Sequence, residues 1–230
     1  MKVLLFSGGL DSFIISRLQQ FDIALFCHIG LPENNKELNC ISSLPMKMPL
    51  LIDRRLRLAD EKLDNEIIPM RNLFFIMIGA YYGDEVTLGA TAGDTTADKT
   101  LKFISLTNNL LEYLFENKSK APRHLVNREF FASIPYKDFT KRELIKLYLE
   151  TGENPHNLSL SRSCYSVLEK ECGKCRSCVR KYAALKLNGI DCESWFAYDP
   201  RPFVEDAFNM SVLKRRGQET EDMKELLERI

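Results

Sequence analysis

Two groups of residues in this sequence have the types and spacing expected of chemical sites. The first is a loop near the N-terminus, Ser7-Gly8-Gly9-Leu10-Asp11-Ser12, which combines two glycines, two hydroxyls and one carboxylate. The second is a short run that holds four cysteines, Cys164, Cys172, Cys175 and Cys178. The composition of the first favours phosphate binding, and that of the second favours metal binding.

The N-terminal loop lies between an apolar run and a helical pattern. Residues 3–6 predict a buried strand, and residues 13–18 predict a helix. A strand-to-helix turn directs free backbone N–H groups and the positive end of a helix dipole at one point, which suits phosphate. The alternative is an ordinary turn in which Ser7, Asp11 or Ser12 caps the helix. Because a cap needs only one such residue, and adjacent glycines let the backbone approach a ligand closely, phosphate binding is favoured.

The clustered cysteines offer the four soft ligands that tetrahedral zinc prefers. Two overlapping C-x-x-C units supply three thiolates, and Cys164 supplies the fourth. Similar spacing occurs at iron–sulfur clusters, and a C-x-x-C unit can also be a redox pair. Zinc is favoured because basic residues between positions 170 and 181 would offset the charge of a zinc tetrathiolate. A closed four-cysteine site leaves no position for substrate, so the metal is expected to hold the C-terminal segment in place.

The overall composition is that of an ordinary globular protein. Of the 230 residues, 45% are hydrophobic and 28% are charged, and the formal net charge is zero, so charge gives no case for a nucleic-acid or membrane partner. No apolar run has the length of a membrane span, and the N-terminus lacks a signal-peptide pattern, so we expect a cytoplasmic protein. In that compartment seven cysteines, four of them together, favour metal over disulfides.

Strand and helix patterns alternate along the chain, which predicts an α/β fold. Near-continuous apolar strands are typical of a parallel sheet with helices on both faces, so a Rossmann-like sheet is expected. Prolines limit residues 33–49 to a short helix at most, and residues 118–128 are expected to form an exposed loop. Further strands are predicted at 23–28, 50–52, 85–89 and 130–135, and further helices at 73–82, 101–115, 140–150 and 219–229.

Ligands of open α/β sheets bind outside the carboxyl ends of the strands. The loop at residues 7–12, the turn after His28 and the small polar loop at residues 90–96 each follow a predicted strand. We therefore expect these three segments to line one crevice. Thr140 and Glu143 have the spacing of a capping box, which predicts a helix that begins beside Lys141.

Three features, in their order along the chain, resemble the QueC family, the 7-cyano-7-deazaguanine synthases among the PP-loop ATP pyrophosphatases. They are the Ser7–Ser12 loop, the stretch Pro69-Met70-Arg71-Asn72 before an apolar helix, and the pattern Ser163-Cys164-Tyr165 … Cys172-Gly173-x-Cys175-x-Ser177-Cys178 with Arg180. The loop alone is typical of the whole superfamily, whereas the cysteine pattern is much narrower. The resemblance covers residues 1–190, and Gly89, Asp94 and Lys141 also fall where the family has matching residues.

The resemblance implies a PP-loop/HUP-type ATP-binding domain at residues 1–155 and a four-cysteine zinc-binding segment at 156–190. The tail at 191–230 would pack on the domain or form a subunit contact, and relatives of this kind are often homodimers. The implied activity adenylates the carboxylate of 7-carboxy-7-deazaguanine with loss of pyrophosphate, after which ammonia forms the amide. A second adenylation and a dehydration yield the nitrile, with ATP, Mg²⁺ and Zn²⁺ as the implied cofactors.

Loop chemistry and the resemblance together assign roles to individual residues. The predicted catalytic residues are Asp11, which would help to hold Mg²⁺, Ser12, and Lys141, which would neutralise charge on the phosphates. The predicted zinc ligands are the four clustered cysteines. The predicted ATP-binding residues are Ser7, Gly8, Gly9, Leu10, Asp11, Ser12, Arg71, Asn72, Gly89 and Asp94.

The sequence departs from the family in the half expected to bind the acceptor. Where QueC proteins carry an aromatic-Pro-Asp-Cys-Arg stretch after the equivalent of Asp94, this chain has Thr96-Ala97-Asp98-Lys99-Thr100. The family's Gly-Gln-Arg-His after the second strand is replaced by Gly30-Leu31-Pro32-Glu33. Two alternatives therefore stay open. One is a QueC-like enzyme that conjugates an activated deazapurine to a protein or nucleic acid, for example in an antiviral system, and the other is a non-catalytic nucleotide-binding module.

Overall fold

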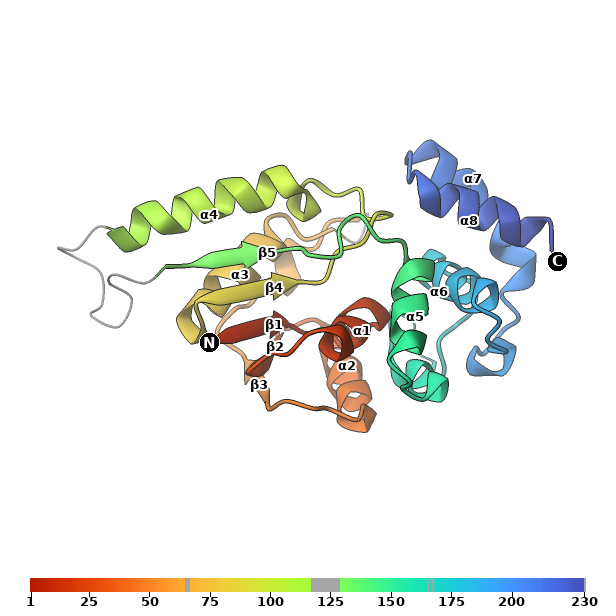
Figure 1. Cartoon of the computed structure of the whole chain (residues 1–230), viewed down its shortest axis with the longest axis horizontal. Coiled ribbons are helices and arrows are strands. Elements are labelled where there is room, and N and C mark those ends of the chain that lie inside the picture. Colours follow the sequence, from red (N-terminus) through yellow and green to blue (C-terminus); the bar gives the residue numbers. More distant parts are fainter. Residues whose placement is uncertain (65–66, 117–128, 165, 167, 230) are drawn as a thin grey trace.

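The computed structural model describes residues 1–64, 67–116, 129–164, 166 and 168–229, and within them the chain forms a five-stranded parallel sheet (Figure 1). The strand order is β3-β2-β1-β4-β5, and each neighbouring pair is parallel. The predicted α/β fold is confirmed. The strands are β1 (Lys2–Leu5), β2 (Ile23–Cys27), β3 (Leu50–Asp53), β4 (Glu85–Leu88) and β5 (Phe131–Ser133).

Each parallel connection of the sheet carries one α-helix, as parallel pairing requires a crossover. The crossover helices are α1 (Leu10–Leu18), α2 (Pro32–Ser43), α3 (Arg71–Tyr82) and α4 (Leu101–Glu116). In the described part of the chain four more α-helices follow β5, and they gather beyond the arrowheads of the strands in Figure 1. They are α5 (Lys141–Glu150), α6 (Arg176–Leu187), α7 (Val204–Leu213) and α8 (Gln218–Leu227).

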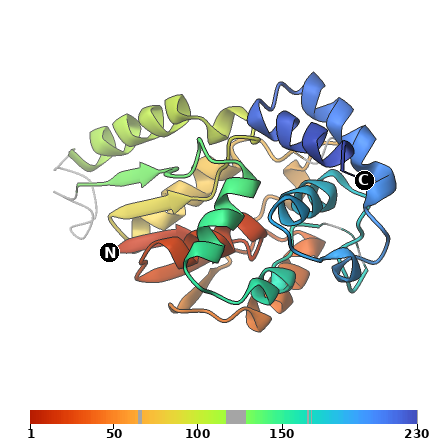
Figure 2. The same ribbon diagram turned by 45° about the vertical axis from the view of Figure 1, so that its right-hand side comes forward.

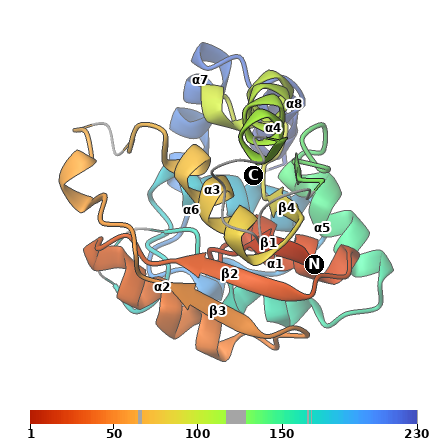
Figure 3. The same ribbon diagram turned by 90° about the vertical axis from the view of Figure 1, so that its left-hand side faces the viewer.

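Alternate residues of β1 enter two separate hydrophobic cores. Leu4 packs in a core with Phe13 of α1 and Tyr182 of α6. Val3 packs in the other core, which includes Ile76 of α3 and residues of α4. Figure 3 shows α3 and α4 above the strands and α2 below them. Both faces of the sheet are therefore covered, which explains why its strands read as nearly continuous apolar runs.

Helix α2 is longer than the sequence analysis predicts. We expected at most a short helix because of Pro45 and Pro49, but α2 runs for twelve residues. Both prolines follow the helix instead of interrupting it. Pro32 occupies the first helical position, where the missing N–H has no intrahelical partner to lose.

Helices α6 and α7 have no counterpart among the predicted elements. α6 begins immediately after Cys175, and most of its residues are buried. α7 begins after Pro200 and Pro202, so these prolines precede a helix in a part of the tail for which we predicted none. α8 matches the helix predicted at 219–229, and α7 and α8 pack on each other and on α6 (Figure 2).

The predicted capping box at the start of α5 is confirmed. The Thr140 hydroxyl accepts a hydrogen bond from the Glu143 N–H at 3.2 Å, and the Glu143 carboxylate accepts one from the Thr140 N–H at 2.7 Å. The loop predicted at residues 118–128 lies outside the described residues. No helix in the described part of the chain has the length and apolar composition of a membrane span.

Candidate active site

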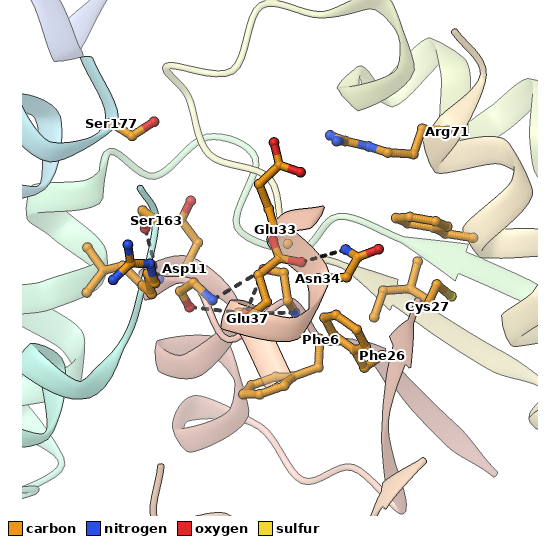
Figure 4. Close-up of a pocket in the computed structure, with 18 of the residues that line it drawn as sticks. Phe6, Asp11, Phe26, Cys27, Glu33, Asn34, Glu37, Arg71, Ser163 and Ser177 are labelled. Atoms are coloured by element: carbon orange, nitrogen blue, oxygen red, sulfur yellow. Dashed lines mark hydrogen bonds between the residues drawn. The ribbon is translucent and has the colours of Figure 1, made fainter. Parts of the chain in front are cut away.

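The strand order places a topological switch point beside β1, because β2 and β4 lie on its two sides. Ligands of open α/β sheets bind in the crevice at the carboxyl ends of strands at such a point. A cavity of about 320 Å³ opens there, within the range of small-molecule sites (Figure 4). Its lining includes the loop after β1, the turn after β2 and the loop after β4, so the expectation of a single shared crevice is confirmed.

The cavity brings together nearly all the residues predicted to bind ATP. Gly8 is the exception, because it does not line the cavity and instead packs against α2. Its φ of +71° favours glycine, and an added Cβ would lie 2.6 Å from Cγ1 of Ile41 on α2. The predicted residues that line the cavity are Ser7, Gly9, Leu10, Asp11, Ser12, Arg71, Asn72, Gly89, Asp94 and Lys141.

The backbone N–H groups of the loop after β1 make only long hydrogen bonds to hydroxyls. The Gly9 N–H donates to the Ser7 hydroxyl at 3.3 Å, and the Leu10 N–H donates to the Ser163 hydroxyl at 3.4 Å. Gly9 itself is the N-cap of α1, so no side chain caps this helix end in the usual way. The alternative in which the loop serves only as a cap is therefore not supported. Hydrogen bonds this long are weak, so these N–H groups can donate to a phosphate oxygen instead.

Lys141 and Asp11 form an ion pair at the first turns of two helices. The ammonium of Lys141 donates to both carboxylate oxygens of Asp11, at 2.5 Å to Oδ1. The two side chains are 11% and 20% exposed, so the pair lies mostly out of water. The structure thus places a cation directly beside the loop that is expected to hold phosphate.

Asp94 lines the same cavity and has several cations near it. Its carboxylate accepts hydrogen bonds from the Thr91 N–H at 3.2 Å and from Lys99 Nζ at 3.1 Å, and Arg180 Nη2 lies 4.0 Å away. Burial alone would raise the pKa of Asp94. The charges of Lys99, Lys141 and Arg180 outweigh burial and hold that pKa below its ordinary value of 3.8. Asp94 is therefore ionised at neutral pH, and with Asp11 it offers the oxygen ligands that Mg²⁺ prefers.

A second wall of the cavity comes from α2 and carries carboxylates that the sequence analysis did not identify. Asn34 accepts hydrogen bonds from the N–H groups of Ile29 and Leu31 at 2.9 and 3.1 Å, and its amide donates to Glu37 at 2.8 Å. Figure 4 shows Glu33 and Glu37 projecting between Asp11 on one side and Arg71 on the other. The sequence analysis named Glu33 only within a segment that departs from the family pattern and did not mark Glu37, because the long helix that presents both was not predicted.

The two carboxylates on α2 have different environments. Burial raises the pKa of Glu37, only partly offset by its bond from Asn34 and by the charge of Arg71. Burial would also raise the pKa of Glu33, but a 2.9 Å hydrogen bond from Lys62 Nζ, a backbone hydrogen bond and the charges of Lys62 and Lys36 together outweigh burial and lower it. Glu37 is therefore the carboxylate whose charge a hydrogen-bond-donating ligand would stabilise.

The four clustered cysteines have the geometry of a tetrahedral metal site. Their sulfur atoms all lie within 4.8 Å of one another, and three of the separations are 3.5, 3.8 and 3.8 Å. Four thiolates at about 2.3 Å from a zinc ion would be about 3.8 Å apart, so the donor set fits zinc. Gly173 has a φ of +79°, and an added Cβ would lie 2.0 Å from the Tyr198 carbonyl oxygen, so the tail packs against this turn.

Two basic residues that we expected to offset the thiolate charge pair with carboxylates instead. The buried Lys181 donates to Glu171 at 2.5 Å and to the Ser161 carbonyl at 2.7 Å. Arg180 pairs with Glu219. These side chains are therefore engaged in holding segments of the chain together.

The residues just before Cys164 connect the cysteine cluster to the loop after β1. The Arg162 N–H donates to the Gly8 carbonyl at 2.9 Å, and the Ser163 N–H donates to Glu171 at 2.7 Å. Through these bonds the cysteine segment forms one wall of the cavity. The sequence analysis did not assign site roles to these lining residues, which are Arg162, Ser163, Ser166, Ser177 and Arg180.

Comparison with known proteins identifies one matching family. The family model described as queuosine biosynthesis protein QueC matches residues 42–189. Three similar proteins are each named 7-cyano-7-deazaguanine synthase. The protein from Methanocaldococcus jannaschii is 25% identical over 229 residues, which cover 80% of this chain and 94% of that protein.

The other two similar proteins match over shorter stretches. The protein from Saccharolobus solfataricus is 30% identical over 133 residues, which cover 55% of this chain and 26% of that protein. The protein from Methanococcus aeolicus is 30% identical over 145 residues, which cover 58% of this chain and 57% of that protein. The matched stretch therefore spans about a quarter of the Saccharolobus solfataricus protein and somewhat over half of the Methanococcus aeolicus protein.

Proposed function

Because this chain belongs to the QueC family, we propose that it is an ATP-dependent ligase that converts 7-carboxy-7-deazaguanine and ammonia to 7-cyano-7-deazaguanine. The substrate carboxylate attacks the α-phosphorus of ATP, and pyrophosphate leaves. Ammonia then displaces AMP from the acyl adenylate and forms the amide. In a second round the amide oxygen attacks the α-phosphorus of another ATP, and pyrophosphate leaves. Loss of AMP and of both N–H protons then gives the nitrile.

The observation that carries this proposal is the combination of a phosphate-type loop and several cations in one cavity. In the proposed reaction the N–H groups of Gly9 and Leu10 hold the departing pyrophosphate, exchanging their long bonds to hydroxyls for bonds to phosphate oxygens. Lys141 shifts from Asp11 toward the phosphates and stabilises the charge that develops there. Asp11 and Asp94 would hold Mg²⁺, which supplies further charge neutralisation when bound.

The carboxylates on α2 support a guanine-like acceptor. A deazaguanine ring presents a ring N–H and an amino group side by side, and a carboxylate accepts from both. The corresponding edge of adenine presents one donor and one acceptor, which suits a carboxylate less well. In the proposed complex Glu37 accepts from the deazaguanine edge, and Asn34 fixes the carboxylate in position.

The test is a reaction of the purified chain with ATP, 7-carboxy-7-deazaguanine and ammonium. We expect AMP, pyrophosphate and the nitrile, detected by chromatography and mass spectrometry, and no AMP when the acceptor is omitted. Asp11→Ala should abolish AMP release. ATP binding without AMP release by the wild-type chain would contradict the proposal and favour the non-catalytic nucleotide-binding module.

One observation favours a second candidate, transfer of the activated deazapurine to a macromolecule. Lys99 belongs to the segment that departs from the family pattern, and it lines the cavity beside Asp94. The acceptor side of this chain therefore differs chemically from the family pattern. A covalent deazapurine on a co-purified protein or nucleic acid, formed without ammonium, would support transfer. Formation of the free nitrile only with ammonium would exclude it.

A further inference from the structure

The C-terminal helix reaches the cavity through one buried carboxylate. Glu219, the second residue of α8, is 4% exposed, and both of its oxygens accept hydrogen bonds from Arg180. The bonds come from Nε and Nη2 of the guanidinium, and the Nη2–Oε2 distance is 2.6 Å. Arg180 lines the cavity, and its Nη2 also lies 4.0 Å from the carboxylate of Asp94. One side chain of α8 thus contacts a cation that lines the candidate site.

The loop after β4 is shaped to admit this carboxylate. A Cβ added to Gly93 would lie 1.6 Å from Oε2 of Glu219 and 2.7 Å from Nη2 of Arg180. A larger residue at position 93 would therefore displace the pair. Arg216, just before α8, donates to the Gly93 carbonyl and lies 3.5 Å from Oε1 of Glu219. These contacts join α6, α8 and the loop that carries Asp94.

The geometry of a guanidinium gives this pairing a consequence for ligand binding. Arginine presents five N–H donors in a rigid, planar fork, so bonds at Nε and Nη2 also set the direction of Nη1. Within the described residues, the hydrogen bonds of Arg180 to its carboxylate partner use Nε and Nη2, which leaves Nη1 for another acceptor. Lys99 and Lys141 line the same cavity, so we expect the group that accepts a hydrogen bond from Nη1 to be an anion.

We propose that Glu219 is a positioning residue that orients Arg180 to bind a phosphate group of ATP or of the pyrophosphate product. Helix α8 would then complete the site from outside residues 42–189, the part that matches the family model. The choice of phosphate as the anion rests on the proposed function. Stabilisation of the fold does not by itself explain the Arg180–Glu219 pair, because burying an ion pair often brings little net stability.

The test compares Glu219→Gln with Glu225→Gln, a matched substitution on the same helix. Glu225 pairs with Arg142 of α5 at 2.5 Å and does not line the cavity. Both variants lose one negative charge and one ion pair between α8 and a neighbouring helix. We expect Glu219→Gln to weaken binding of inorganic pyrophosphate about tenfold, the effect of one charge-assisted hydrogen bond. The KM for ATP should rise by a similar factor with a smaller change in kcat, and Glu225→Gln should change neither.

The direction of the change in pyrophosphate affinity distinguishes a positioning role of Glu219 from the effect of its charge alone. Removal of a negative charge near an anion site should by itself tighten anion binding. Unchanged or tighter pyrophosphate binding by folded Glu219→Gln would therefore overturn the proposal. Gly93→Ala displaces the carboxylate without changing charge, and it should weaken binding in the same way; normal binding by this variant would also overturn the proposal. If the wild-type chain binds neither pyrophosphate nor ATP, the proposed function itself fails.

Discussion

Lys141 and Asp11 are 130 positions apart in the sequence, yet the ammonium of Lys141 donates to both carboxylate oxygens of Asp11. Each residue lies in the first turn of a helix, and the two helices, α1 and α5, pack against each other. The pair keeps a cation beside the phosphate-type loop without burying an uncompensated charge. In the proposed reaction Lys141 shifts toward the phosphates of ATP, which would free Asp11 to hold Mg²⁺.

Lys141→Met should therefore lower the rate of AMP formation about 10²-fold, the usual effect of removing one group that stabilises transition-state charge. The rate is measured as acceptor-dependent AMP release. Lys146→Met is the control, because Lys146 is an exposed lysine of the same helix. Equal loss of activity in both variants, or full activity in Lys141→Met, would contradict the assigned role.

Glu37→Gln should affect the acceptor and not ATP. The amide keeps the shape of the carboxylate but cannot accept from two adjacent N–H donors equally well, so the KM for 7-carboxy-7-deazaguanine should rise about tenfold. The KM for ATP should stay within twofold of the wild-type value. Glu112→Gln, an exposed substitution on α4, should change neither constant. A rise in the KM for ATP alone would instead place the adenine ring against α2.

The cysteine cluster predicts about one zinc ion per purified chain, measured by elemental analysis. Cys178→Ser should lose the metal, because serine does not replace a thiolate ligand well. Cys192→Ala should retain it, since Cys192 is buried outside the cluster. Removal of the metal by a chelator should increase proteolysis between Cys172 and Cys178, because the metal would tie these ligands together. Iron, or no metal in a folded chain, would contradict the assignment.

Asp94 predicts a specific pH dependence of stability. Its pKa is lower in the folded protein than its ordinary value of 3.8, so its ionised form stabilises the fold above that pH. This contribution is lost as pH falls through the lower, folded pKa. The difference in free energy of unfolding between wild type and Asp94→Asn should be constant at pH 5–7 and shrink below about pH 3.8, as measured by urea denaturation. If the difference in free energy of unfolding instead grew as the pH fell, the pKa of Asp94 would be raised on folding, which would contradict this prediction.

Gly8 and Gly152 form a matched pair for testing the loop after β1. Both have positive φ values, +71° and +76°, but only Gly8 has a neighbour that an added Cβ would strike. Gly152→Ala should destabilise the protein by about 1 kcal/mol, the cost of the left-handed conformation. Gly8→Ala should cost more, because Ile41 must also move, and thermal unfolding measures both. Equal costs would show that α2 yields freely at this contact.

Local patterns in the sequence predicted the elements that form within short stretches of chain. The apolar strands, the capping box of Thr140 and Glu143 and the spacing of the four cysteines depend on residues close together, so each could be recognised directly. The parallel order also placed the loops after β1 and β4 in one crevice, since the carboxyl ends of parallel strands meet at the same edge. The main local error was α2, where Pro45 and Pro49 led us to predict a short helix at most, whereas both prolines follow a helix of twelve residues.

The partners of the site's charged groups were decided only by tertiary packing. Nothing near Lys141 in the sequence indicates Asp11, and nothing near Arg180 indicates Glu219, 39 positions away. Such pairs depend on the angle and distance at which whole helices dock, which the hydrophobic cores set. The sequence by itself predicted a phosphate-type loop and a parallel sheet, and it placed four thiols with metal-ligand spacing in one short segment. The folded structure decided which cations and carboxylates share the cavity, because long-range charge pairing follows from packing and not from local pattern.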